Sequence, residues 1–463
     1  MSVTRSILDY LQAQGMHTVD TDYRAHIDRW RSWYRGKVEH FHTYTVFNGV
    51  RRVKCSRKTL GMAKMLAEDW ASLLLNERVR IAVDHDQDAL DALLRANRWR
   101  IIGNRCVEYA FALGTAGWSE YLGPDGAPCV DVHQAEEIWP LSWHGTRVTE
   151  CAFSSLEVVG GEKCVFLRIY RRGAGGQTVI ENALLDQESG EARPLPEGVP
   201  ARVETGIAAP LFQIVTPNLA NNIDTTCPMG LAVFANALDI LESVDGTYDS
   251  LANEYLLGRK RLMVPLSMVQ RDQTASGRPD AFFDPNDLAF AAYPAAGDGS
   301  DEFHDFSPEI RAEAHVRGLR TELNALSIRC GLGAGRYEFE RAAGVKTATE
   351  VISEDSDLYQ NLQKHEIILE SAIAELCNAL LLLSGRQPAE VSITFDDSII
   401  QDKSAERSEA REDVAAGLMS KYTYLTQIRG LSEKDADEEL ERIRSESRVG
   451  AEALDFFGLK NSD

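Results

Sequence analysis

The chain has 463 residues, which is too long for one compact hydrophobic core and predicts two to four structural modules. Apolar residues make up 44% and charged residues 26% of the sequence, a balance that excludes general disorder. The formal net charge is −22, whereas a protein that grips nucleic acid needs a basic surface to displace counterions from the phosphates. The charge therefore argues against static DNA binding, with the exception of a protein past which DNA must slide.

No signal peptide, membrane span or paired-cysteine motif is predicted. Residues 1–5 lead into a short mixed helix without an apolar signal core. The longest purely apolar run in the C-terminal half, residues 379–383, is far shorter than the roughly 18 residues of a membrane span. The eight cysteines include no Cys-x-x-Cys pair, so we expect reduced thiols packed as small apolar side chains. We expect the chain to work in the cytoplasm, or wherever a cytoplasmic assembly is carried.

The first part of the chain, to about residue 205, predicts helices followed by strands. Aromatic residues within 21–35 and apolar residues at helical spacing within 59–76 indicate two helices, and a third is expected over 105–113. After these, short alternating runs such as residues 164–170 are broken by glycine-rich turns. This pattern indicates a β-rich region.

The middle of the chain predicts two helices with a compact β-rich insertion, residues 263–306, between them. Pro228 is expected to open the first helix, which would run to about Leu257. The second is expected to begin at Ser307-Pro308-Glu309, since serine, proline and an acid suit a helix N-terminus, and to end at Gly331. Apolar residues at steps of four and three form the seams of these helices: Ala237, Leu241, Val244, Tyr248, Leu251 and Tyr255 in the first, and Val316, Leu319, Leu323 and Leu326 in the second.

A glycine-rich loop and a third long helix are predicted next. A Thr347-x-x-Glu350 capping box opens this helix, and Gly385 ends it. Its seam comprises Leu369, Ile373, Leu376, Leu380 and Leu383. A strand over residues 391–399 and two charged helices separated near Gly430, the second capped by Ser432, complete the prediction.

Fragments that resemble enzyme motifs each lack an essential residue. Residues 344–347 read Gly-Val-Lys-Thr, whereas a phosphate-binding loop needs its glycine directly before the lysine. Gly331, Gly333 and Gly335 follow a predicted helix, whereas a dinucleotide fingerprint follows a strand. Residues from Asp84 onward begin like a calcium-binding loop, but Arg95 stands where such a loop has the glutamate that binds calcium through both carboxylate oxygens. We therefore expect no enzyme activity, no cofactor and no metal site.

Motifs spread over nearly the whole chain carry a resemblance to a known family. They include Trp30-x-x-Trp33-Tyr34-x-Gly36, Trp70-Ala71-x-Leu73-Leu74-x-Asn76-Glu77, Tyr248-Asp249-x-Leu251-x-Asn253-Glu254, Lys346-Thr-Ala-Thr-Glu-Val-Ile-Ser-Glu354 and Phe395-Asp-Asp-Ser-Ile399. Together they resemble the portal proteins of tailed bacteriophages and prophages, specifically the group typical of long-tailed siphophages. The 346–354 motif, extended by Ser356 to Tyr359, is the most specific.

The resemblance implies an α+β portal fold with a mixed wing domain, stem helices, a small β-rich clip and a helical crown. The expected boundaries are 1–226 for the wing domain, 227–262 for the first stem helix, 263–306 for the clip, 307–330 for the second stem helix, 331–345 for the tunnel loop, 346–401 for a long wing helix and strand, and 402–463 for the crown.

The resemblance also implies a structural subunit that forms a dodecameric ring at one capsid vertex, through which double-stranded DNA is packaged and ejected. The expected partners are the terminase large subunit, the major capsid and scaffold proteins, and a head-completion adaptor, with no membrane. The expected location is the virion, with assembly in the host cytoplasm. An alternative is a non-viral oligomeric scaffold protein without DNA translocation.

Three groups of site residues are expected in such a ring. The tunnel loop, which is expected to have a fixed base and a mobile tip that touches DNA, contributes Gly331, Gly333, Gly335, Arg336, Arg341 and Lys346. The acids expected to line the channel are Asp239, Glu242 and Asp249. The acids expected to contact partners at the clip are Asp280, Asp284, Asp287, Asp298, Asp301 and Glu302.

Each group has an alternative. Arg336 and Arg341 could instead pair with Glu338, Glu340 or a neighbouring subunit, since exposed ion pairs are common. The acids of the first stem helix could point outward or pair with arginines between subunits. The clip acids could belong to a solvated loop.

Overall fold

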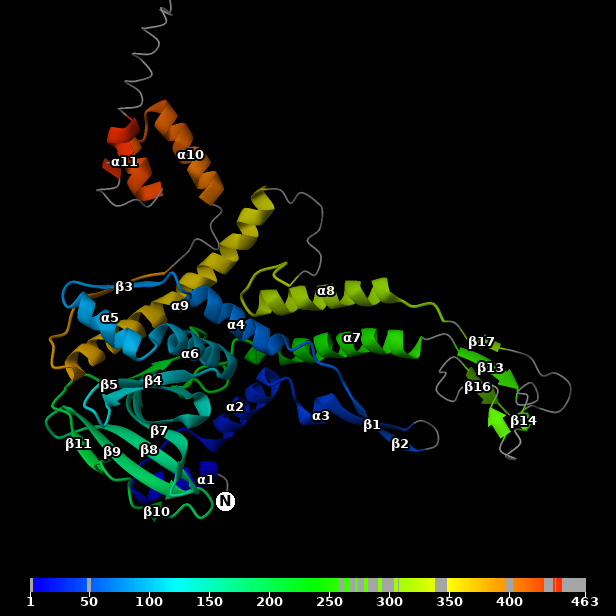
Figure 1. Cartoon of the computed structure of the whole chain (residues 1–463), viewed down its shortest axis with the longest axis horizontal. Helices are drawn as coiled ribbons and strands as arrows, with labels where there is room; N and C mark the ends of the chain where they lie inside the picture. Colours follow the sequence, from blue (N-terminus) through cyan, green and yellow to red (C-terminus); the bar gives the residue numbers. More distant parts are fainter. Residues whose placement is uncertain are drawn as a thin grey trace, which may run out of the picture. The chain divides into compact units, whose positions relative to one another are not determined.

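The structure is a computed structural model, and the chain divides into two compact units, Met1–Phe395 and Asp396–Asp463, each described separately (Figure 1). The described residues are 3–47, 51–258, 261–265, 271–273, 279–281, 290–293, 304–306, 308–337, 348–395, 403–428, 436–437 and 439–443.

Helices dominate the first part of the chain, with a small hairpin between them. The elements are α1 (Val3–Ala13), α2 (Thr21–Tyr34), α3 (Glu39–His42), β1 (Thr43–Phe47), β2 (Arg52–Ser56), α4 (Met62–Leu74), β3 (Arg80–Val83), α5 (Gln87–Ala96) and α6 (Trp99–Leu113). The Asp20 side chain caps α2 by accepting a hydrogen bond from the backbone N–H of Asp22. The helices predicted over 21–35, 59–76 and 105–113 are confirmed as α2, α4 and α6, the last with an earlier start.

Antiparallel sheets follow, which confirms the predicted β-rich region. Their strands are β4 (Ala116–Leu122), β5 (Pro128–Gln134), β6 (Ile138–His144), β7 (Arg147–Val159), β8 (Glu162–Arg172), β9 (Thr178–Asp186), β10 (Ala192–Arg193), β11 (Arg202–Glu204) and β12 (Phe212–Val215). The larger sheet has the order β10-β9-β8-β7-β6, with β11 also pairing with β9, and the smaller has the order β12-β4-β5. Ile7 and Leu11 of α1 pack against Trp139 and Val165 of the larger sheet. The residues Phe153 and Tyr170 instead form a second core cluster with Phe212.

The longest helix is α9 (Ala348–Leu383), which confirms the third predicted helix. Its seam residues Leu369, Ile373, Leu376 and Leu380 are buried, and the helix packs on β12 and β4. Strand β18 (Val391–Thr394) then pairs antiparallel with β3. The predicted strand is therefore confirmed for these residues, whereas 396–399 lie outside the described residues.

The helix predicted from Pro228 begins later, as α7 (Leu238–Leu257), after a single 3-10 turn η2 (Ala235–Ala237). Residues 229–234 are apolar because they are buried on all sides, not because they form a helical stripe. The Val233 N–H donates to the Phe111 carbonyl. Gly230 packs so closely on Gly114 that an added Cβ would lie 2.5 Å from the Gly114 carbonyl oxygen. This tight backbone contact prevents an earlier helix start.

The helix predicted from Ser307 also begins later, as α8 (Ala312–Arg329). The backbone N–H and the guanidinium of Arg311 are both bound by Glu254 of α7. These bonds hold the segment from Pro308 to Arg311 outside the helix, so the start signal lies upstream of the true first turn. Ser307 itself lies outside the described residues.

Short strands lie between α7 and α8, as predicted for the insertion. They are β13 (Arg261–Pro265), β14 (Arg271–Gln273), β15 (Pro279–Ala281), β16 (Phe290–Tyr293) and β17 (His304–Phe306). Strand β13 pairs parallel with β16 and antiparallel with β17. Among the described residues of 263–306, the insertion is thus a small sheet with a separate β14–β15 pair.

The second unit contains α10 (Lys403–Ala416), the short α11 (Lys421–Thr423) and a π-helical turn η5 (Tyr424–Ile428). The first charged helix is confirmed, but it ends at Gly417, which has φ +76°, rather than near Gly430. Gly430 and Ser432 lie outside the described residues. With the first unit, this gives the α+β fold class that the sequence predicts.

Candidate functional site

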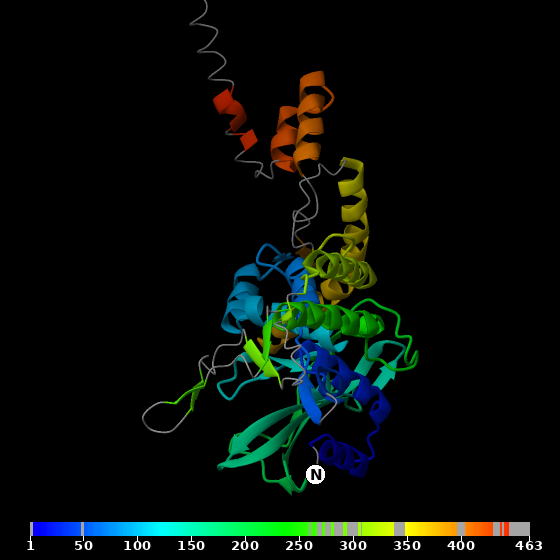
Figure 2. The same ribbon diagram turned by 90° about the vertical axis from the view of Figure 1, so that its right-hand side faces the viewer.

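The antiparallel helices α7 and α8 pack along each other and form the centre of the site (Figures 1 and 2). Leu241 and Val244 of α7 and Leu319 and Leu323 of α8 are buried. Between the helices, Glu322 accepts hydrogen bonds from the hydroxyls of Ser243 (2.9 Å) and Thr247 (3.0 Å). The pair is therefore joined by an apolar seam and by polar bonds beside it.

The predicted seams are not buried along their full length. Tyr255, near the end of α7, is 52% exposed, and Val316, near the start of α8, is 40% exposed. Leu256 and Ile310 nearby are also exposed. An apolar surface therefore remains uncovered at the end of the pair where α7 finishes and α8 begins.

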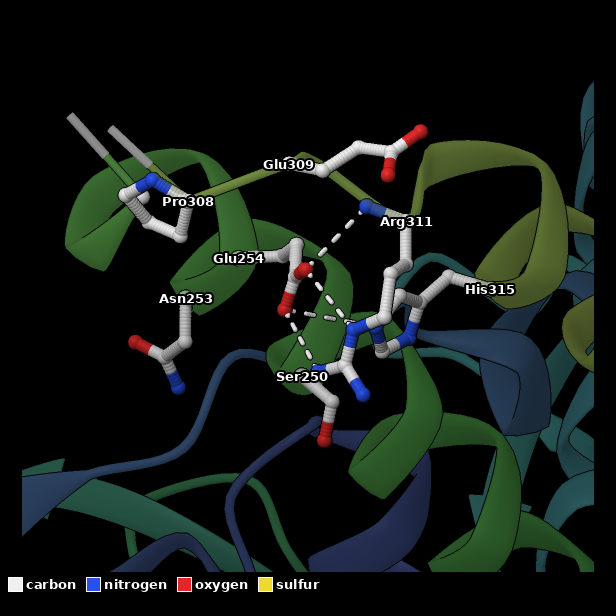
Figure 3. Close-up of a pocket in the computed structure, with 8 residues that line it drawn as sticks. Ser250, Asn253, Glu254, Pro308, Glu309, Arg311 and His315 are labelled. Atoms are coloured by element: carbon white, nitrogen blue, oxygen red, sulfur yellow. Dashed lines mark hydrogen bonds and ion pairs between the residues drawn. The ribbon is translucent and has the colours of Figure 1, made fainter. Parts of the chain in front are cut away.

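A pocket of about 560 Å³ lies at the same end of the helix pair (Figure 3). At its centre, Glu254 accepts from the Arg311 backbone N–H at 3.1 Å and from the Arg311 guanidinium at 3.0 Å. His315 Nε2 lies 3.7 Å from the same carboxylate. The hydrogen bonds from Arg311 lower the pKa of Glu254 to about 2. The ionised carboxylate thus links α7 to the segment just before α8. A carboxylate with so low a pKa is a poor proton donor or acceptor near neutral pH.

The three acids predicted to line a channel have different environments. Asp239 is exposed and Glu242 is partly exposed, which leaves both available to a channel or to another subunit. Asp249 is only 7% exposed. Its two carboxylate oxygens accept from the Lys58 backbone N–H and from the Asn253 side chain, both at 3.0 Å. The prediction for Asp249 is therefore wrong, because its carboxylate is used inside the subunit.

Asp245, which the sequence analysis did not single out, anchors the same segment one turn earlier on α7. It is 3% exposed and accepts from the Leu60 backbone N–H at 2.8 Å. Its other oxygen lies 3.0 Å from His42 Nε2. Since His42 Nδ1 accepts from the Val38 backbone N–H, Nε2 carries the proton and donates to Asp245. In the sequence, the four-residue spacing of Asp245 and Asp249 places both acids on one face of the helix, which could have indicated a shared role.

These acids hold the base of a structure that we call the basic hairpin, residues 43–58, which includes β1 and β2. Its sequence contains five basic residues and no acid, in a chain of net charge −22. They are Arg51, Arg52, Lys54, Arg57 and Lys58. The hairpin was not among the site residues expected from the sequence, although its local density of positive charge is visible along the chain.

The first half of the predicted tunnel loop is hydrogen-bonded to the body. A fixed base was expected at Gly331, whereas the mobility expected of Gly333 and Gly335 is contradicted. Ser327 Oγ donates to the Gly333 carbonyl, and the Gly335 N–H donates to Asn324. The Gly331 carbonyl accepts from Asn361 of α9. The three glycines are needed for positive φ, between +76° and +82°, because the backbone turns sharply after α8.

Arg336 is likewise held within the subunit. Its Nε lies 3.4 Å from Asp69 of α4, and Tyr337 donates to the same carboxylate oxygen at 2.8 Å. Burial and the neighbouring Asp69 raise the pKa of Tyr337. The alternative of an ion pair is thus realised for Arg336, with Asp69 as its partner, whereas Glu338 and Glu340 lie outside the described residues. Arg341 and Lys346 lie outside the described residues.

The clip acids stay a prediction. Asp280 lies in β15, opposite Asp272 in the β14–β15 pair. The others, Asp284, Asp287, Asp298, Asp301 and Glu302, lie outside the described residues.

The described residues offer no support for a metal site or a membrane span. No group of three or more histidine, cysteine or acidic side chains there could hold a metal ion. The carboxylates of the calcium-like fragment are used in other ways, since Asp84 accepts from the Glu390 N–H and Asp86 pairs with Arg386. No helix in the described part of the chain is both long and apolar enough to cross a membrane.

Comparisons with known proteins give one family. Residues 186–452 match the family model described as phage portal protein, SPP1 Gp6-like. A solved structure described as the neck of a native GTA particle computed with C12 symmetry shares 13% sequence identity, and the alignment covers 79% of this chain and 88% of that chain with a TM-score of 0.40. No curated protein sequence matches the chain significantly. The family match spans more than half of the chain and includes α7, α8 and α9.

Proposed function

The chain belongs to the SPP1 Gp6-like family of phage portal proteins, and from this membership we propose that it is a structural subunit of a dodecameric ring at one capsid vertex. The ring is the conduit for packaging and ejection of double-stranded DNA. The observation that carries the proposal is the match over residues 186–452, because that range contains the paired helices, the insertion between them and the long helix α9.

We assign the parts of the subunit as follows. The sheets and the helices before them form the wing, α7 and α8 form the stem, and residues 263–306 form the clip. Residues 331–345 form the tunnel loop, whose first seven residues are fixed to the body. Helix α9 and β18 return across the wing, and residues 402–463 form the crown. The hydrogen bonds from Ser243 and Thr247 of α7 to Glu322 of α8 support a stem that moves as one element.

The charge of the chain suits a conduit for DNA. Twelve copies at −22 each carry −264 in total, so phosphates in a central channel meet a repulsive field overall. Asp239 and Glu242, which are accessible on α7, are the acids that we propose for the channel wall. Duplex DNA carries one charge per about 1.7 Å of axis, so even a modest ring of fixed acids discourages static contacts.

The partners that we propose are the terminase large subunit during packaging and a head-completion adaptor afterwards, both at the clip. The major capsid and scaffold proteins would surround the ring at the capsid vertex, with assembly in the host cytoplasm. The acids of the clip would increase the encounter rate with basic partner surfaces more than the final affinity.

The family is a structural one, so we propose no catalytic step for this chain. We expect purified protein to hydrolyse no ATP. Hydrolysis that is lost in a Lys346→Ala variant would contradict this part of the proposal, because Lys346 is the lysine of the phosphate-loop-like fragment.

Native mass spectrometry of the purified full chain tests the ring. Twelve copies of the 51.4-kDa chain give about 617 kDa. We expect this species to dominate at micromolar concentration, alone or with rings that differ by one subunit. A protein that stays monomeric or dimeric under all salt conditions would contradict the proposal.

A further inference from the structure

The basic hairpin carries exposed apolar and basic side chains. Val46 is 45% and Phe47 is 64% exposed, and the side chains of Arg52, Lys54 and Lys58 are exposed as well. None of these three basic side chains forms an ion pair within the part of the chain that the structure describes. An isolated two-stranded hairpin is marginally stable in water, and it gains stability when it packs on other elements.

The base of the hairpin is nonetheless rigidly mounted. Asp249 and Asp245 of α7 bind the backbone N–H groups of Lys58 and Leu60. Arg57 at the base donates to the Phe41 carbonyl at 2.7 Å, and its guanidinium stacks over the Phe41 ring. A rigid base with an exposed apolar and basic far end is the arrangement of a preorganised binding element, because little entropy is lost when it docks.

The complementary surface lies at the start of α8. Residues 279–309 contain eight acids and no lysine or arginine. Glu309 at the end of this segment and Glu313 just after it are exposed, and Ile310 between them is 42% exposed. The basic residue between these two acids, Arg311, is bound to Glu254. An exposed apolar residue beside exposed acids thus matches exposed apolar residues beside the exposed basic side chains of Arg52 and Lys54.

The hairpin and the start of α8 lie on different sides of α7. Figures 1 and 2 show α7 between the hairpin on one side and α8 on the other. Figure 1 also shows the hairpin running beside α7 toward the C-terminal end of that helix, which is the end where α8 begins. In a head-to-tail ring, one flank of each subunit meets the opposite flank of the next. Two surfaces on different sides of α7 are therefore candidates for such a contact between neighbouring copies.

We propose that the basic hairpin docks on the entry to α8 of the neighbouring copy, with Arg52 and Lys54 facing Glu309 and Glu313 and Phe47 covering Ile310. The proposal rests on the proposed ring. The proposed contact is a surface through which each subunit binds the next one in that ring. Double-stranded DNA is a less suitable occupant, because phosphate binding gives no reason for the exposed Val46 and Phe47.

Charge reversal in two separate chains tests the contact. The hairpin variant carries Arg52→Glu and Lys54→Glu, and the landing variant carries Glu309→Lys and Glu313→Lys. A control carries Arg29→Glu and Lys163→Glu, which reverse two exposed basic residues that have no ion pair within the described residues. Each test variant alone should need about tenfold more protein, or more, for half-assembly in sedimentation velocity, because like charges then face each other. The control should assemble as wild type does.

Mixing the hairpin and landing variants in equal amounts should restore assembly, since an alternating ring brings opposite charges together at every contact. If only a single chain with all four changes assembles, the contact lies within one copy and the proposal is wrong. If the hairpin variant forms rings normally but loses binding to a labelled DNA duplex, the hairpin is a DNA contact and the proposal is also wrong. Wild-type protein that forms no ring would instead refute the ring itself, so the two failures are distinguishable.

Discussion

Among single residues, Asp249 and Asp239 show most clearly that two acids on one helix can have different roles. Asp249 caps a backbone N–H inside the subunit, whereas Asp239 is exposed. We expect Asp249→Ala to lower the free energy of unfolding by about 2 kcal/mol, because a buried N–H loses its charged acceptor. Asp239→Ala should change it by no more than about 0.5 kcal/mol. Urea unfolding of both variants measures this difference, and equal effects would contradict the structural role of Asp249.

Glu120 is a second residue whose role depends on burial. It is fully buried on β4, and neither carboxylate oxygen has a hydrogen-bond partner among the described residues. Burial, with Glu375 nearby, raises the pKa of Glu120 well above its ordinary value. The folded state therefore holds a proton that the unfolded chain releases once the pH exceeds its ordinary carboxyl pKa, so wild-type stability falls as the pH rises between the two pKa values.

A Glu120→Gln variant removes this proton linkage. Its stability relative to wild type should rise between pH 5 and pH 8, by up to about 1.4 kcal/mol for each pH unit that lies between the two pKa values. Chemical unfolding at both pH values, with Glu188→Gln on the surface as control, measures the change. A difference from wild type that does not vary with pH would show that Glu120 is ionised in the folded protein.

Site residues could be predicted from the sequence only in part. The density of acids on α7 is visible in the sequence, but the same carboxylate suits a channel wall and a backbone cap. Only the chain that passes over α7, here residues 58–60, decides between the two. The charge of the basic hairpin was also visible, yet the attachment of its base to Asp245 depends on a contact between residues 185 apart in sequence.

At the level of elements, the seams of α7, α8 and α9 were predictable because packed helices need apolar residues at regular spacing. Their starting points were not. The α7 start is delayed by the tight contact between Gly230 and Gly114, and the α8 start by the bonds between Arg311 and Glu254. Both causes are tertiary contacts, which local start signals do not contain.

Two glycines, one in the turn after α8 and one in the middle of α7, differ in the space around them, and we expect opposite effects when each is replaced by alanine. Gly331 has φ +82° and an added Cβ would lie 3.3 Å from the Trp70 ring, so Gly331→Ala should destabilise the fold by about 1 to 2 kcal/mol. Gly246 in the middle of α7 has no atom within 4 Å of such a Cβ, so Gly246→Ala should stabilise the isolated subunit by about 0.5 to 1 kcal/mol. Thermal unfolding of both variants tests the assignment. Tolerance of alanine at Gly331 would mean that this turn is not fixed against α4.

For the molecule as a whole, the family could be predicted because motifs that resemble it are spread over nearly the whole chain. The order of helix, strand insertion, helix and long helix was also predicted correctly. The bonds that hold Gly333 and Gly335 were not predicted, because side chains such as Ser327 and Asn324 of α8 could equally have faced solvent. The net charge of −22 gains its meaning only from the assembly, in which many copies would surround one DNA duplex.

Cryo-electron microscopy of the purified full chain would show whether it forms a ring around a passage for DNA. We expect a ring of about twelve subunits whose axis is an open channel wide enough for duplex DNA, with α7 and α8 around it. An assembly that is closed on its axis, or that has no rotational symmetry, would contradict it.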